Sequence, residues 1–187
     1  MLKEDKVEEV PLKDDEEQRI ELTINPKNPF QASFWEKDGK VMKVADDKVW
    51  QGFVSEEIVP KDRYCSFAVR IMTSQCNNTE IGLVGQGYKM ERNKTCKESV
   101  VYHLADGMVL SGVANREGSE WKRRGQPVRQ KARVLVEVKV DPERQTVTWV
   151  ADGQTVGQGA LSGYLKKHEC VAYVMMCHKG DILELNP

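Results

Sequence analysis

The sequence predicts an all-β chain with little helix, folded as a sandwich or a barrel. Short segments in which apolar residues alternate with polar ones recur from residue 20 to residue 185. Turn-forming clusters rich in glycine, aspartate and proline separate these segments. No stretch of about 12 residues keeps apolar side chains at the i, i+3, i+4, i+7 spacing of a helix. Many short strands divided by turns are typical of a sandwich or a barrel.

The clearest predicted strand covers residues 133–140. Its four valines occupy the even positions from 134 to 140, and charged residues occupy most of the odd positions. Because successive side chains of a strand point to opposite faces, this pattern predicts a strand with one buried face.

A second strand is predicted at residues 146–151, with Val147, Trp149 and Ala151 toward the core. The polar residues 141–145 form the turn between the two strands. Asp152 and Gly153 follow, and this pair suits the positive φ angles of a tight hairpin.

The remaining predicted strands share short length and β-forming composition. They cover residues 20–24, 66–72, 80–85, 99–103, 170–177 and 182–185. Gly82 indicates a bend or bulge in its strand. Cys170 and Cys177 are an odd number of residues apart on one predicted strand, so one is expected to be buried and the other exposed.

The 187 residues are enough for one domain, preceded by a tail. Residues 1–22 have a net charge of −5, and the remaining residues have +4. An acidic segment of this kind is typical of a solvated tail. We therefore predict a disordered acidic tail over residues 1–18 and a folded domain over residues 19–187.

Cysteine usage and hydropathy indicate the compartment. The five cysteines include no C-x-x-C pair, and the N-terminal residues do not have the pattern of a secretory signal. No apolar run approaches the roughly 18–20 residues that a membrane span needs. We expect reduced thiols and a cytoplasmic location, with the nucleus as the alternative.

Four stretches in this order resemble a SPRY domain. They are Tyr64–Ile71 followed by Glu80–Val84, Val101–Gly107, Val136–Gly153, and Ala172–Met176 followed by Gly180–Leu185. The resemblance implies a two-sheet antiparallel β-sandwich of the concanavalin or jelly-roll kind. The chain departs from the family pattern at Gln130–Ala132 and at Cys170–Val171, so it resembles a divergent member.

The resemblance also implies a non-catalytic module that binds a protein or peptide through loops at one end of the sandwich. It implies an adaptor or a subunit of a larger complex, and we expect a monomer on its own. The candidate partner-binding residues are Pro60, Lys61, Arg63, Tyr88, Cys177, His178 and Lys179.

Binding of RNA or single-stranded nucleic acid is the alternative. Residues 116–133 have a net charge of +5 and include a tryptophan, which suits phosphate attraction and base stacking. The candidate residues are Arg116, Trp121, Lys122, Arg123, Arg124, Arg129 and Lys131.

The sequence predicts no catalytic residue, no metal site and no cofactor. Cys177, His103 and Asp181 lie in no known nucleophile motif. Cys170 and Cys177 would lie roughly 23 Å apart on one strand, too far to share a zinc ion. Gly85 and Gly87 lack the third glycine and the following helix of a phosphate loop.

Overall fold

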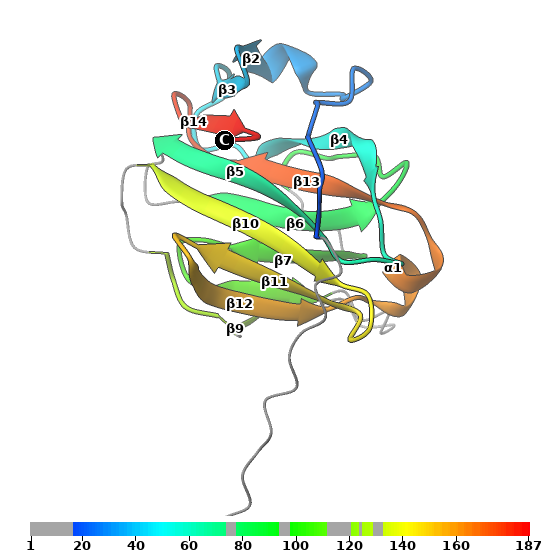
Figure 1. The fold of residues 1–187 in the computed structure, drawn as a ribbon. Coiled ribbons are helices and arrows are strands. Elements are labelled where there is room, and N and C mark those ends of the chain that lie inside the picture. The colour runs from blue at the N-terminus through cyan, green and yellow to red at the C-terminus, as the bar shows by residue number, and fades with distance from the viewer. Residues whose placement is uncertain (1–16, 74–77, 94–97, 112–120, 124, 129–132) are drawn as a thin grey trace, which may run out of the picture.

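The computed structural model describes residues 17–73, 78–93, 98–111, 121–123, 125–128 and 133–187. These residues form two sheets that face each other as a β-sandwich (Figure 1). Neighbouring strands are antiparallel, except that the two-residue strand β1 runs parallel to β5. The predicted fold class, a two-sheet antiparallel sandwich with little helix, is confirmed.

The eight-stranded sheet has the order β12-β11-β10-β5-β14-β3-β2, with β1 beside β5. Its strands are β1 (Gln18–Arg19), β2 (Phe34–Lys37), β3 (Lys40–Lys43), β5 (Cys65–Thr73), β10 (Val134–Asp141), β11 (Thr146–Ala151), β12 (Gln154–Ala160) and β14 (Ile182–Leu185).

The six-stranded sheet has the order β4-β13-β6-β7-β8-β9. Its strands are β4 (Gln51–Val59), β6 (Thr79–Gly85), β7 (Ser99–His103), β8 (Met108–Ser111), β9 (Trp121–Arg123) and β13 (Cys170–Met176). The described residues also include a 3-10 turn, η1 (Gln31–Ser33), and a short helix, α1 (Gly163–Lys167).

The core lies between the inner faces of the two sheets, with Trp149 of β11 at its centre. Trp149 is fully buried, and its indole nitrogen donates a hydrogen bond of 3.0 Å to the Ile81 carbonyl of β6. Its ring stacks on Tyr102 of β7, with centroids 5.5 Å apart. Trp149 therefore joins strands of both sheets through a hydrogen bond and an aromatic stack.

The alternating pattern predicted for β10 and β11 is confirmed. The four valines of β10 are buried, and the residues between them are half-buried. Val147, Trp149 and Ala151 are the buried positions of β11. Asp152 and Gly153 follow with φ angles of 46° and 81°, as a tight hairpin turn requires.

The prediction that one of Cys170 and Cys177 is exposed is wrong, because both are buried. β13 is buried at all seven of its positions. Its outward residues, including Tyr173 and Met175, belong to a second apolar cluster on the outer face of the six-stranded sheet. Alternation along a strand separates buried from exposed residues only where one face meets solvent.

A segment that we call the strap, residues 86–93, covers the outer face of β13. It begins where the Gln86 amide donates to the Glu169 carbonyl, next to the first residue of β13. It ends at Asn93, which is hydrogen-bonded to Trp50 near the last residue of β13. Between these points, Tyr88 and Met90 pack into the outer apolar cluster.

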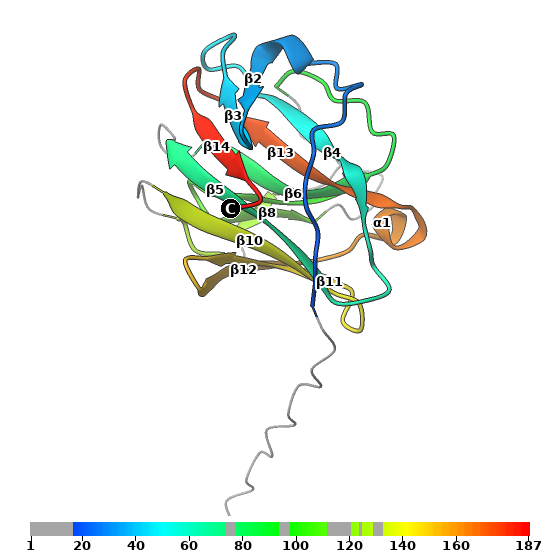
Figure 2. The same cartoon turned by 45° about the horizontal axis from the view of Figure 1, so that its top comes forward.

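Residues 20–24 alternate as predicted but do not form a strand. Ile20, Leu22 and Ile24 are buried, yet the segment has only one isolated bridge, from Ile24 to Ser55. Figure 2 shows it crossing the side of the sandwich. The hydrogen bonds of its backbone amides pass from one sheet to the other. The Ile20 amide donates to the Ser66 carbonyl of β5, and the Asn25 amide donates to the Val54 carbonyl of β4. A segment that changes sheet cannot form a continuous ladder with either one.

Gly82 does not mark the bend or bulge that we predicted. The registers of β6 with β13 and with β7 continue without a shift through Gly82. A Cβ atom at this position would lie 1.9 Å from the Val100 carbonyl oxygen. Glycine is therefore required here because the neighbouring backbone approaches closely.

Candidate functional site

The candidate partner-binding residues do not lie at one end of the sandwich. Pro60, Lys61 and Arg63 follow β4, beside the start of β13. Cys177, His178 and Lys179 follow the end of β13. A seven-residue strand is roughly 20 Å long, so the two groups lie at opposite ends.

Lys61 has a structural role at the helix end of the sandwich. Its ammonium group donates to the carbonyl oxygens of Leu165 and His168. These carbonyls lie at the C-terminal end of α1, where a cation is favourable. Arg63 pairs with its neighbour Asp62 at 3.1 Å, and both side chains are exposed.

Tyr88 belongs to the strap rather than to an end loop. Its ring lies 6.4 Å from that of Tyr173, centroid to centroid, and it is half-buried in the outer apolar cluster. Tyr88 therefore lies between the two ends.

The end that contains His178 has the more extensive network of contacts between loops. We call the following segments the loop platform: residues 44–50, 92–93, 103–107 and 177–181. They come from four regions of the chain, and each makes a side-chain contact with at least one of the others.

The buried side chain of Lys43 holds the β3–β4 loop of the platform in place. Its side chain is fully buried, and its ammonium donates to the Ala45 carbonyl at 2.7 Å and to the Asp46 carbonyl. Burial lowers the pKa of Lys43, and the nearby carboxylates only partly oppose this effect. The loop wraps tightly around this group, and Asp46 and Lys48 adopt positive φ angles of 49° and 58°.

Asp47 connects this loop to residues 177–181. Its carboxylate accepts the Lys179 amide at 3.1 Å and lies 3.6 Å from Nδ1 of His178. The hydrogen bond from the Lys179 amide is the main reason that the pKa of Asp47 is lowered. His178 Nε2 lies 3.0 Å from the amide nitrogen of Asn78, which can only donate, so this histidine nitrogen is the acceptor.

Trp50 occupies the other side of the platform. Its ring meets His103 edge to face at 5.6 Å, and its amide donates to the Asn93 side chain at 2.8 Å. His103 pairs with Asp106 at 2.9 Å. Arg92 and Asp46 form an ion pair of 3.1 Å that joins the end of the strap to the β3–β4 loop.

The sequence pattern indicated His178 and Lys179 as candidates but did not indicate Asp46, Asp47 or Trp50. The available signal was the Asp-Asp-Lys cluster of residues 46–48, which is typical of a turn. Nothing in the sequence indicates that this turn lies beside residues 177–181.

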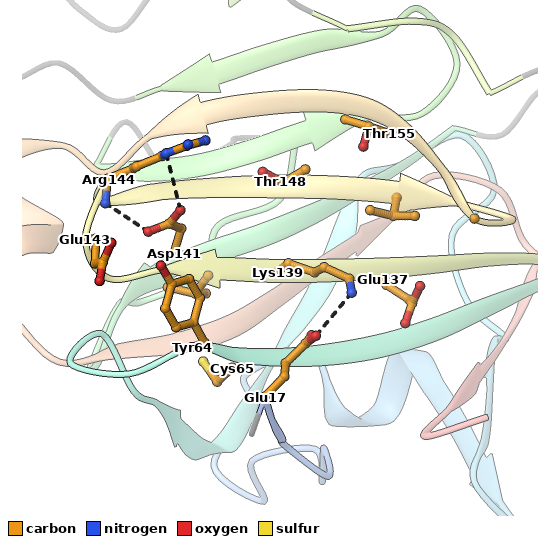
Figure 3. Close-up of a pocket in the computed structure, with 13 residues that line it drawn as sticks. Glu17, Tyr64, Cys65, Glu137, Lys139, Asp141, Glu143, Arg144, Thr148 and Thr155 are labelled. Carbon is orange, nitrogen blue, oxygen red and sulfur yellow. Dashed lines mark hydrogen bonds and ion pairs between the residues drawn. The ribbon is translucent and has the colours of Figure 1, made fainter. Parts of the chain in front are cut away.

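A second concave surface lies on the outer face of the eight-stranded sheet. It is an open groove of about 640 Å³ over β10, β11 and β12 (Figure 3). None of the candidate partner-binding residues lines it.

Most of the candidate nucleic-acid residues lie outside the described residues. Trp121, Lys122 and Arg123 form β9, the edge strand paired with β8. Arg116, Arg124, Arg129 and Lys131 lie in the parts of the chain that the structure does not describe. The nucleic-acid prediction therefore stays a prediction.

The described ranges contain no group of three or more histidine, cysteine, aspartate or glutamate side chains placed to hold a metal ion. Cys65, Cys170 and Cys177 are free and buried. Within the same ranges, no helix is long and apolar enough to cross a membrane.

Comparison with known proteins identifies the class of fold. No family model and no curated protein sequence matches the chain. Among solved structures, a human SPRY domain superposes with a TM-score of 0.62 and 18% identity, covering 82% of this chain and 94% of that chain. The chain therefore has the SPRY type of β-sandwich.

Two further structures support this assignment. The SPRY domain of human HERC1 gives a TM-score of 0.63 and 11% identity, covering 88% of this chain and 97% of that one. The PSpry domain of TRIM65 gives a TM-score of 0.60 and 13% identity, covering 90% of this chain and 93% of that one. The resemblance predicted from the four sequence stretches is confirmed at the level of the fold.

Proposed function

We propose that this protein is an interaction module, an adaptor or a subunit of a larger complex, that binds a protein partner through the loop platform. The SPRY type of fold supports a binding role. The observation that carries the proposal is that contacts between distant segments hold the platform loops in place before any partner arrives.

Such a surface favours binding because little conformational freedom is lost on association. Loops held on a rigid sandwich are a common place for recognition residues. The platform offers a half-buried aromatic ring, Trp50, next to exposed charges at Asp46, Asp47, Lys48 and Lys179. A partly buried aromatic surrounded by charge is typical of the residues that dominate protein interfaces.

The experiment is affinity purification with the full chain, followed by identification of the proteins recovered. The test variant carries Lys48→Glu and Lys179→Glu on the platform. The control carries Lys166→Glu and Lys167→Glu on α1, at the opposite end, and has the same change in net charge. We expect the platform variant to recover about tenfold less of each specific partner than the wild type does. The control should recover as much of each partner as the wild type.

Partners that bind the platform variant and the wild type equally would overturn the proposal. Repeating the purification at two salt concentrations, with and without nuclease, separates proteins that bind directly from proteins recovered through RNA. Recovery that depends on RNA and falls steeply with salt would also overturn it.

A further inference from the structure

The groove on the outer face of the eight-stranded sheet lies apart from the loop platform. The strand registers arrange its side chains in rows across the sheet. Glu137 of β10 pairs with Val150 of β11, which pairs with Thr155 of β12. Lys139 and Thr148 form the next row. The groove therefore has a regular floor of outward side chains from adjacent strands.

The floor combines apolar surface with small hydroxyl groups. Val150 is a half-buried aliphatic side chain on the outward face of β11, between Thr148 and Thr155. Tyr64 stands at one end of the groove, near the turn between β10 and β11 (Figure 3). Such a floor can pack against the aliphatic stem of a long cationic side chain.

The charges of the groove favour a cation. Its two basic groups are already paired, Lys139 with Glu17 at 3.2 Å and Arg144 with Asp141 at 3.8 Å. Two further carboxylates, Glu137 and Glu143, line the same groove and leave it with a net charge of −2. After burial, the charges of Asp141 and Glu143 are the next causes of the raised pKa of Tyr64, which is consistent with a negative potential here.

The sequence directly before Glu17 is also acidic. Glu17 lines the groove, and residues 1–16, which have a net charge of −4, are joined to it directly. These residues would be repelled by the carboxylates of the groove, so they are disfavoured as its occupant. Their charge instead favours a cationic partner over an anionic one.

We propose that the groove is a second docking surface, and that its occupant is an extended segment of a partner protein carrying lysine or arginine at alternate positions. An extended chain directs every second side chain to the same face, so alternate cations would all face the sheet. Their ammonium or guanidinium groups would reach Glu137 and Glu143, while their stems cover Val150.

The test uses the full chain and a fluorescein-labelled octapeptide of alternating lysine and threonine, followed by fluorescence anisotropy. A second peptide has glutamine at every lysine position. We expect the lysine peptide to bind the wild type at least about tenfold more tightly than the glutamine peptide, with the difference shrinking as salt is added.

The decisive variant carries Glu137→Lys and Glu143→Lys, and a milder one carries Glu137→Gln and Glu143→Gln. The control carries Glu36→Lys and Glu98→Lys, which are exposed positions outside the groove lining. We expect the charge reversal in the groove to weaken binding of the lysine peptide about tenfold or more, the neutral pair to weaken it less, and the control to change it less than about twofold.

Three results would overturn the proposal: equal binding of both peptides, no effect of either groove variant, or an equal loss in the control. An equal loss in the control would mean that the peptide responds only to net charge. The Lys48→Glu, Lys179→Glu variant should bind the lysine peptide like the wild type, so the groove and the loop platform can fail independently.

Discussion

The two sheets contribute to one core, but their outer faces differ. β13 of the six-stranded sheet is buried at every position, because the strap and an apolar cluster cover its outward side chains. β10 of the eight-stranded sheet alternates between buried and half-buried positions, because its outward side chains line an open groove. The apolar pattern of a strand therefore reports how many of its faces are covered.

The same difference separates structural from recognition surfaces. The outer face of β13 holds Tyr173 and Met175 against the strap. The outer face of β10 holds Glu137 and Lys139, whose polar groups remain accessible from the groove. Changes on the covered face should therefore affect stability, and changes on the open face should affect binding.

The largest effect is expected from Gly82→Ala, in the covered sheet. The new Cβ would collide with the backbone of β7, so we expect a loss of about 4 kcal/mol or more in the free energy of unfolding. Gly163→Ala is the matched control, because a Cβ there has no atom within 4 Å. Chemical denaturation of both variants checks this, and wild-type stability for Gly82→Ala would contradict the close approach.

A smaller effect tests the two outer faces directly. Met175→Ala removes a fully buried side chain and should cost about 2–4 kcal/mol. Lys139→Ala removes a half-buried, paired side chain on the open face and should cost about 0.5 kcal/mol or less. Urea denaturation measures the free energy of unfolding of both variants. Equal losses would contradict the claim that one outer face is covered and the other is open.

The thiols test whether the open face admits solvent to the core beneath it. Burial raises the pKa of Cys65, in β5, and of Cys170, in β13, to about 11. A raised folded-state pKa gives stability that is complete below the unfolded pKa near 9 and is lost as the pH rises toward 11.

We therefore expect the stability of the wild type to fall between about pH 9 and about pH 11 relative to a Cys65→Ala, Cys170→Ala variant. The difference should grow by on the order of 1 kcal/mol per pH unit for each thiol above pH 9. Single variants assign the contributions. If the stability difference between the wild type and the Cys65→Ala variant does not change with pH, solvent reaches Cys65 in the core under the groove.

A further effect concerns the anchor of the strap, Asn93. Asn93 has a φ of 53°, and its side chain accepts the Trp50 amide. Asn93→Gly keeps the conformation and loses the hydrogen bond, whereas Asn93→Ala loses both, so we expect costs of about 1 and about 2 kcal/mol respectively. Hydrogen exchange should speed up at Trp50 in both variants. Unchanged exchange would mean that Asn93 does not anchor the strap.

Much of the fold was predictable because local patterns specify it. The valines of β10, the turn at Asp152 and Gly153, and the inward position of Trp149 all follow from neighbouring residues in the sequence. Residues 20–24 show the limit of this reasoning. Their alternation correctly indicates which side chains are buried, but not that the backbone crosses from β5 to β4.

The candidate site was less predictable, because its parts are far apart in the sequence. Asp47 and Lys179 meet only because β4, β13 and β14 place their loops at the same end. Lys61 looked available for a partner, yet α1 packs close enough for its carbonyls to bind the ammonium group.

The amino-acid order alone specifies where strands lie and which side chains of β10 and β11 point inward, since alternation and turn chemistry depend on adjacent residues. The folded arrangement specifies which outer face is covered, which loops meet and which carboxylates gather along the groove. These properties arise from contacts between segments separated by more than a hundred residues, such as Asp47 with Lys179, and no local pattern encodes such contacts.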